Sequence, residues 1–326
     1  MIGILSYLVF FATVAAILSI AVLGLNLHWG NTGLFNGGVA AFFGAGAYGT
    51  LILARPAQEG HFGGFEIPYL LALIGGMAIA ALLAWAVGRL TLRLRHDYLA
   101  IATFGVAVAF ENFMRNAEWF SGGAQGVRGF QRPLEAAIGP GLTYNIAFLA
   151  FVAVLLVLTY LFLERLVASP FGRLLRAIRE DETAARSLGK SPARIRLTAF
   201  VTGSAIMGLA GGLYATRYAF VSPQDVLPIL TFQIWAMLIV GGAGNNRGAI
   251  LGAFTIWAAW TSSGWLLSRF APSEMQLYTG TIQYILIGLV IVGMLLWRPQ
   301  GLFPERLVVS QTGIPPKSTK TGSSPS

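Results

Sequence analysis

The sequence contains no cysteine, and only 11% of its 326 residues are charged. The missing cysteines exclude disulfides, thiolate catalysis and cysteine metal sites. An ordinary soluble domain carries roughly 25% charged residues, so the charges here are too few to cover a surface that faces water. With 56% hydrophobic residues and a mean hydropathy of +0.69, the composition excludes a soluble enzyme and indicates a protein embedded in lipid.

Nine stretches are apolar enough and long enough to cross a membrane as helices, which takes about 20 residues each. Their cores lack Asp, Glu, Lys and Arg, and Glu111 lies close to the outer end of the fourth. The second is so rich in Gly and Ala that a broken or re-entrant helix inside the bundle fits as well as a straight crossing. We expect an all-α polytopic transmembrane bundle of about nine spans, within a range of eight to ten: 3–25, 33–54, 68–88, 98–114, 143–163, 198–217, 228–242, 249–268 and 278–297.

The positive charges predict how the bundle is oriented. Of the 22 Lys and Arg residues, 15 lie in three segments: 89–97, 164–197 and the tail after residue 297. Because such an excess marks the cytoplasmic side, we expect these segments inside, with the N-terminus outside and the C-terminus inside. The Pro-, Ser- and Thr-rich residues 311–326 are expected to form a disordered cytoplasmic tail after one transmembrane domain over 1–310. The segments expected outside are 55–67, 115–142, 218–227 and 269–277.

The loop 164–197 contains a predicted surface helix. Ser169 suits the N-cap, Pro170 the first helical position and Gly189 the C-terminal stop, whereas Gly172 is a place where the helix could break. Apolar residues spaced by three, four and seven positions share one stripe of this helix. The stripe consists of Phe171, Leu174, Leu175, Ile178, Ala185 and Leu188.

An amphipathic helix in such a loop can lie on the inner leaflet, pack back on its own bundle, or dock in a groove of a soluble partner. The polar face of this helix mixes Arg with Glu and Asp. Anionic lipid would favour a purely basic face, so the mixture favours a protein partner.

Several motifs, in their order, resemble a known family. Thr183-Ala184-Ala185, followed after three residues by Gly189, is similar to the cytoplasmic coupling motif of ABC importer permeases. Two positions depart from the pattern: Thr183 replaces a Glu, with Glu182 just before it, and Val108 stands where relatives often carry an acid. Over nearly the whole chain the sequence resembles the branched-chain amino acid permeases. Among them it is most similar to the second of the two related membrane subunits. The segments that carry this resemblance are Gly33–Thr50, Asp97–Asn116 with Gly122–Gly126, Ala210–Ala215, Gly241–Gly244 with Gly248, and Arg298–Phe303.

The resemblance implies one membrane half of an ATP-driven importer of branched-chain or similar hydrophobic amino acids in the bacterial inner membrane. A homologous permease subunit would form the other half, with two cytoplasmic ATPase subunits and a substrate-binding protein outside; lipid is a partner and nucleic acid is not. The chain would be a transport subunit rather than an enzyme, with no cofactor, because its partners bind ATP. The residues implied in ATPase coupling are Phe171, Leu174, Leu175, Ile178, Arg179, Glu182, Ala184, Ala185 and Gly189.

Uncharged polar residues at membrane depth are candidates to line a substrate pathway, although hydrogen bonding between helices is the commoner role of such residues. We favour Asn36 and Thr103, followed by Asn112 and by Glu111, the acidic residue near the outer end of the fourth span. The three histidines, His28, His61 and His96, are scattered and have no carboxylate at ligand spacing, so we expect no metal site.

Two glycine patterns mimic nucleotide motifs. Ala184–Ser191 matches a loose phosphate loop, but it ends a predicted helix and meets Pro192 instead of opening a helix after a strand. Gly44–Gly49 matches the dinucleotide fingerprint inside an apolar segment, where close helix contacts explain it. We therefore expect no ATP site in this chain.

Other functions remain open on the sequence alone. One alternative is an importer of urea, short amides or aromatic acids with the same architecture. An ion-coupled carrier or channel acting alone is a second, and a membrane scaffold a third. The lack of ionisable residues in the span cores argues against a carrier, which usually keeps a charged relay at membrane depth.

Overall fold

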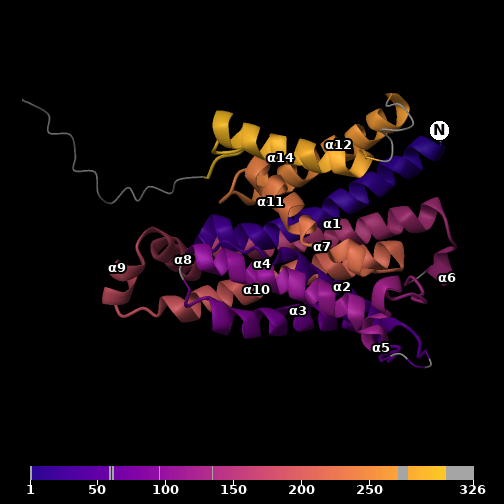
Figure 1. The fold of residues 1–326 in the computed structure, drawn as a ribbon, viewed down its shortest axis with the longest axis horizontal. Coiled ribbons are helices and arrows are strands. Elements are labelled where there is room, and N and C mark those ends of the chain that lie inside the picture. The colour runs from indigo at the N-terminus through magenta and orange to yellow at the C-terminus, as the bar shows by residue number, and fades with distance from the viewer. Residues whose placement is uncertain are drawn as a thin grey trace, which may run out of the picture.

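The computed structural model describes residues 2–58, 60, 62–94, 96–133, 135–270 and 278–305. These residues form an elongated helical bundle (Figure 1). Among them, β-type pairing is limited to isolated bridges that join Pro56 to Phe65 and Val127 to Val221. The prediction of an all-α fold is confirmed.

Six helices are long and apolar enough to cross a membrane: α1 (Ile2–Thr32), α3 (Tyr69–Thr91), α7 (Leu142–Ala168), α10 (Pro192–Tyr218), α12 (Asn246–Phe270) and α14 (Thr279–Trp297). The apolar helices α2 (Val39–Ala54) and α11 (Ile229–Gly241) are shorter, and α4 (His96–Asn116) carries charges at both ends. Each predicted span overlaps one of these nine helices, but the nine-span count remains a prediction. The short elements are α5 (Glu118–Ser121), η1 (Gly123–Gln125), α6 (Glu135–Ile138), α8 (Pro170–Glu180), α9 (Glu182–Ser187) and η2 (Pro223–Val226).

The boundary between the first two helices differs from the prediction. Helix α1 continues to Thr32 instead of ending near residue 25, and α2 begins at Val39 instead of residue 33. The last turns of α1 stay helical because their polar side chains find partners in the bundle; Asn26 Nδ2 donates to Asn246 Oδ1 at 2.9 Å. The linker then starts at Gly33, whose φ of +70° suits glycine.

Glycines hold the centre of the bundle together. A Cβ atom on Gly46 of α2 would overlap the backbone of Gly208 in α10, and one on Gly211 of α10 would overlap the carbonyl group of Phe43. Every residue of α2 from Val39 to Ile52 is buried. This glycine-rich segment is therefore packed inside the bundle, where its glycines serve close helix contacts, and whether it crosses the membrane stays a prediction.

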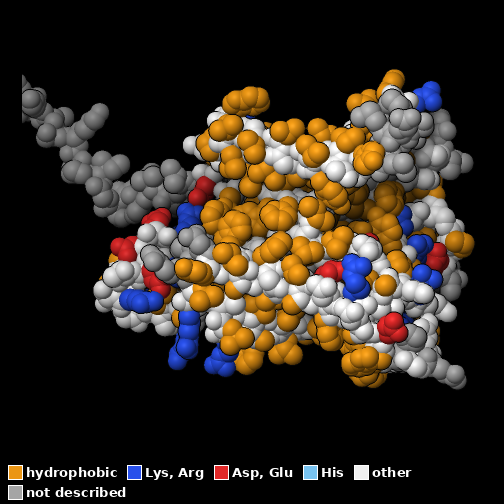
Figure 2. All heavy atoms as spheres, in the orientation of Figure 1, with side chains coloured by type: hydrophobic (Ala, Val, Ile, Leu, Met, Phe, Trp, Pro, Cys, Tyr) orange, Lys and Arg blue, Asp and Glu red, His pale blue; other side chains and the backbone are white. Residues whose placement is uncertain are grey.

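The outer helices carry an apolar surface. Large exposed apolar side chains lie along α3, α7 and α14, and Figure 2 shows hydrophobic side chains spread over much of the visible face. Such a surface suits acyl chains better than water. Together with the six long apolar helices, it identifies a multi-pass membrane protein.

The loops gather at two ends of the bundle (Figure 1). Helices α8 and α9, the turn after α3 and residues 298–305 lie at one end, which we call the inner end after its predicted sidedness. Helices α5 and α6 lie at the other, the outer end, where Val127 pairs with Val221. The described parts of the three basic segments thus share one end, as the charge pattern predicts.

Residues 298–305 return to the bundle beside α11. Leu302 N donates to the carbonyl oxygen of Val240 at 2.8 Å, and Phe303 N donates to that of Gly241 at 3.0 Å. Gly242 and Gly301 both have positive φ and lie against each other, so neither backbone leaves room for a side chain. Two motifs that carry the family resemblance, Gly241–Gly244 and Arg298–Phe303, therefore form one structural unit.

Candidate functional site

The loop between α7 and α10 folds into two helices instead of the one predicted. The start is as expected: Ser169 Oγ accepts a hydrogen bond from Gly172 N at 3.4 Å, and Pro170 opens α8. The helix continues through Gly172 but breaks at Asp181. The Asp181 carboxylate accepts hydrogen bonds from Thr183 N and Ala184 N at 2.8 and 2.9 Å, so this residue caps α9.

The predicted stop at Gly189 is confirmed. Gly189 has a φ of +73°, its N–H donates to the Arg186 carbonyl, and the N–H of Lys190 donates to the Ala185 carbonyl. These two bonds are the Schellman arrangement that ends many helices.

Glu182 fastens α9 to the bundle. Its carboxylate accepts hydrogen bonds from Arg186 in the same helix and from Arg196 in the first turns of α10, both at 2.5 Å. Burial alone would raise the pKa of Glu182, but the charges and hydrogen bonds of Arg196 and Arg186 outweigh it and hold this pKa below its ordinary value.

The apolar stripe of the loop divides between the bundle and the solvent. Leu175, Ile178 and Ala185 are buried in the chain itself, which is the packing back on the bundle that the sequence left open. The other predicted coupling residues are more accessible: Phe171 and Leu174 are half-buried, and Ala184 and Gly189 are exposed. Leu188 is a large apolar residue of this loop that is 78% exposed.

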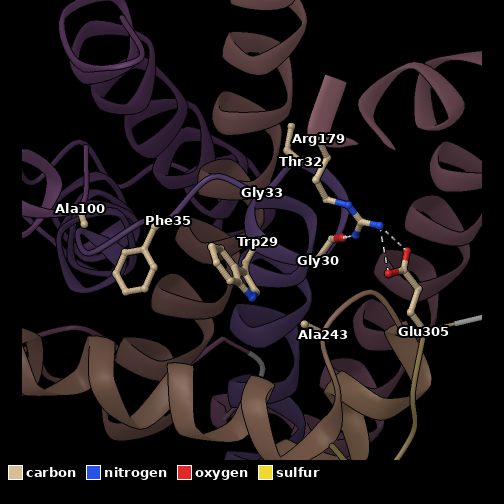
Figure 3. Close-up of a pocket in the computed structure, with 9 residues that line it drawn as sticks. All are labelled: Trp29, Gly30, Thr32, Gly33, Phe35, Ala100, Arg179, Ala243 and Glu305. Carbon is tan, nitrogen blue, oxygen red and sulfur yellow. Dashed lines mark hydrogen bonds and ion pairs between the residues drawn. The ribbon is translucent and has the colours of Figure 1, made fainter. Parts of the chain in front are cut away.

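Arg179 joins α8 to two other parts of the inner end (Figure 3). Its Nη1 donates to the carbonyl oxygen of Gly30 in α1. Its Nη2 lies 3.0 and 3.1 Å from the two carboxylate oxygens of Glu305. Helix α8 is thereby tied both to the end of α1 and to the segment that returns beside α11.

The Arg179–Glu305 ion pair lines a pocket of about 600 Å³, which we call the inner pocket. Figure 3 shows Trp29 and Phe35 on one side of it and the ion pair on the other. Trp29 and Phe35 meet edge to face with ring centroids 5.7 Å apart, and Trp235 stacks on Phe35 at 4.3 Å. The remaining lining residues are small: Gly30, Thr32, Gly33, Ala100 and Ala243.

Asn36 and Thr103 meet next to this aromatic group. Asn36 Oδ1 accepts from Gly38 N at 2.8 Å, so its Nδ2 donates to His28 Nδ1 at 3.1 Å. The ring proton of His28 therefore lies on Nε2, which donates to the Phe200 carbonyl at 2.9 Å. Thr103 Oγ1 accepts from Gly37 N at 2.9 Å. Since both predicted pathway residues are buried, they fix the linker that carries Phe35.

The other two predicted pathway residues lie apart from this junction. Glu111 is buried and pairs with Arg115 one turn along α4, with 2.8 Å between Arg115 Nε and Glu111 Oε1. Asn112 is exposed and donates to the Val108 carbonyl of its own helix. The structure thus brings Asn36 and Thr103 together but not Glu111 and Asn112.

Sequence reasoning missed the aromatic residues and Glu305. Trp29 and Trp235 fit the general pattern of tryptophans at membrane interfaces, so their sequence neighbourhood gave no reason to pair them. Trp235 Nε1 donates to the Asn36 carbonyl at 2.9 Å, across nearly two hundred residues of sequence. Only the fold brings Trp29 and Glu305 to one pocket and stacks Trp235 on Phe35 beside it.

A metal site finds no support in the described part of the chain, where no group of three or more His, Asp or Glu residues is suitably placed. His28 uses both ring nitrogens for hydrogen bonds within the protein. His61 and the side chain of His96 lie outside the described residues.

These features define a multi-pass helical membrane protein whose loop between α7 and α10 reaches a pocket through Arg179. A family model described as "branched-chain amino acid transport system / permease component" matches residues 7–295. The chain belongs to this family.

Individual relatives agree with the family match. The chain is 36% identical over 314 residues to the high-affinity branched-chain amino acid transport system permease protein LivM of Escherichia coli K12, covering 90% of this chain and 69% of the relative. It is 28% identical over 256 residues to a probable LivM permease of Methanocaldococcus jannaschii, covering 73% and 70%. An autoinducer 2 import system permease protein LsrC of Photorhabdus laumondii is 25% identical over 190 residues, covering 57% and 52%. No solved structure matches the chain.

Proposed function

We propose that this chain is the permease subunit of an ATP-driven importer that moves branched-chain amino acids across the bacterial inner membrane. Membership of the permease family carries the proposal. The Arg179 link between α8 and the inner pocket supplies a route by which a motor outside the membrane can act on the bundle.

In this proposal the importer contains a homologous permease subunit, two cytoplasmic ATPase subunits that bind ATP, and a substrate-binding protein on the outer side. Residues 1–310 act as one permease domain with the coupling loop 164–197, and this chain has no ATP site or cofactor of its own. The proposed cytoplasmic tail, 311–326, lies outside the described residues.

The ATPase subunits dock on the accessible residues of the coupling loop, chiefly the exposed Ala184 and Leu188 and the half-buried Leu174. The buried residues Leu175 and Ile178 attach α8 to the bundle instead of touching the partner. When the ATPases close, they push on α8, and Arg179 passes the displacement to Gly30 at the end of α1. The bundle then changes between its inward- and outward-facing states as a rigid element moves.

Leu188→Asp tests the docking. The variant places a charge in the middle of the proposed contact at an exposed position, so the fold should be kept while ATPase recruitment and isoleucine uptake fall at least about tenfold. Both are measured in membranes that contain the whole importer. Ser187→Asp, at an exposed position next to it, is the matched control and should leave both nearly unchanged.

Unchanged recruitment and uptake in Leu188→Asp would overturn the docking assignment. Ile178→Asp is unsuitable as a test because it would bury a carboxylate in the bundle and destabilise the fold.

A further inference from the structure

We propose that the inner pocket is a subsite for the zwitterion of an apolar amino acid, which it holds on the way to release. This inference rests on the proposed function and names the residues that recognise the substrate. Arg179 would bind the carboxylate, Glu305 the ammonium group, and Trp29 with Phe35 the apolar side chain.

The ion pair offers one charge of each sign at the same spot. Arg179 and Glu305 keep 25% and 27% of their side-chain surface exposed, and both line the pocket. The bonds described above engage three of the five guanidinium N–H donors, which leaves two for another acceptor. The carboxylate oxygens of Glu305 also retain lone pairs for another donor.

An amino acid carries its ammonium and carboxylate groups on the same carbon atom. When its carboxylate lies beside Arg179 and its ammonium group beside Glu305, the two ligand charges and the two side-chain charges alternate in sign. Each group of the ligand then meets an opposite charge, and the pocket gains no net charge. A ligand with only a carboxylate would leave Glu305 facing a like charge, and one with only an amine would do the same at Arg179.

The opposite wall of the pocket supplies the apolar contact. Trp29 and Phe35 are each 37% exposed, although aromatic side chains in a bundle are more often buried. Trp235 supports Phe35 from behind by stacking at 4.3 Å. The two accessible rings form a preorganised apolar surface for a branched side chain.

The floor of the pocket is kept clear by residues without large side chains. Gly30, Gly33, Ala100 and Ala243 line it, and together they leave about 600 Å³, which is in the range of small-molecule sites. The pocket also touches α8 through Arg179, so a bound amino acid contacts the same side chain that links the coupling loop to α1.

The test uses the complete importer in nanodiscs without the substrate-binding protein, and measures binding of radiolabelled isoleucine. Two competitors separate the charges: the 2-oxo acid of isoleucine lacks the ammonium group, and 2-methylbutylamine lacks the carboxylate. We expect each to compete at least about tenfold more weakly than isoleucine.

Two variants connect this binding to the pocket. Ala100→Leu fills the pocket without touching the ion pair and should weaken isoleucine binding at least about tenfold, whereas Ala86→Leu on the exposed side of α3 should not change it. Glu305→Gln should weaken isoleucine but not the oxo acid, so that the preference between them disappears. If Glu305 only tethers its segment to α8, both ligands change equally in Glu305→Gln.

Isoleucine uptake by the wild-type importer is measured with the binding protein in liposomes. It distinguishes a failure of the proposed function from a failure of the subsite alone. No isoleucine uptake would overturn the proposed function. Normal uptake together with no effect of Ala100→Leu, or with an unchanged preference in Glu305→Gln, would overturn the subsite alone. Glu305→Asp keeps the charge and should retain the preference if Glu305→Gln proves too unstable to measure.

Discussion

Helices α2 and α14 have similar compositions and opposite surroundings. Both are apolar helices that contain several glycines. In α2 every residue from Val39 to Ile52 is buried, whereas in α14 Gln283 is the one residue described as buried. Gly46 of α2 and Gly211 of α10 each lie so close to another backbone that a Cβ atom would overlap it, but a Cβ atom on Gly288 of α14 would meet no described atom within 4 Å. Composition therefore identifies a span without telling whether it faces protein or lipid.

The difference in glycine contacts determines how rigidly the central and the outer helices are held. Backbone contacts at glycines fix the distances among α1, α2 and α10, because no flexible side chain lies between them. Helix α14 is held more loosely, with Gln283 Nε2 donating to the Trp260 carbonyl of α12 at 2.9 Å. The centre should behave as one rigid body to which the outer helices are attached.

Gly211→Leu against Gly288→Leu is the strongest test of this contrast. The first substitution puts a side chain into the Phe43 carbonyl and should cost about 3 kcal/mol or more, since helices at a backbone contact must separate. The second should change stability by less than about 0.5 kcal/mol. Thermal melting of the purified proteins in detergent measures both, and equal losses would show that the centre is no tighter than the periphery.

Asn36→Leu against Asn112→Leu tests the same contrast for polar residues. Without the Asn36 side chain, Gly38 N–H and His28 Nδ1 lose their partners inside the bundle, which should cost about 1–3 kcal/mol. Asn112 is exposed and bonds only within its own helix among the described contacts, so its replacement should be nearly neutral. The comparison fails if the two variants melt at the same temperature.

The smallest effect concerns Glu182 at the inner end. Its pKa is lowered in the folded protein, so the ionised carboxylate stabilises the attachment of α9 at pH values above the ordinary value of 4.5. That contribution is lost as the pH falls below 4.5 through the folded-state pKa. Amide hydrogen exchange in α9, corrected for its intrinsic pH dependence, should therefore become about threefold less protected on acidification. Glu182→Gln should remove this pH dependence, and an unchanged profile in the variant would refute the assignment.

The local features of the fold were predictable from the sequence because their causes are local. Ser169, Pro170 and Gly189 act within one helical turn of their own positions, and the long continuous apolar runs place the long helices. The break at Asp181 also had a local cause, an Asp placed to cap the next helix. It was missed because Asp181 also fits the polar face of one continuous helix.

The site was less predictable because its contacts join distant parts of the chain. Asn36 and Thr103 are buried beside this site, and their role in a substrate pathway stays a prediction. Sequence reasoning did not identify His28 and Trp235, the partners of Asn36. The end of α1 was placed too early because Asn26 looks like a loop residue until Asn246 and Gly244 supply its partners. Glu305 was missed because nothing near it in the sequence indicates Arg179.

The short length of α11 has a consequence for how the protein is made. A helix of 13 residues is too short to cross a bilayer unaided, and its last carbonyl groups need partners that its own turns do not provide. Val240 and Gly241 obtain theirs from Leu302 and Phe303, which the ribosome adds some sixty residues later. Helix α11 therefore reaches its final state only after Leu302 and Phe303 have been synthesised, and a chain truncated before Leu302 should leave the last carbonyl groups of α11 without these partners.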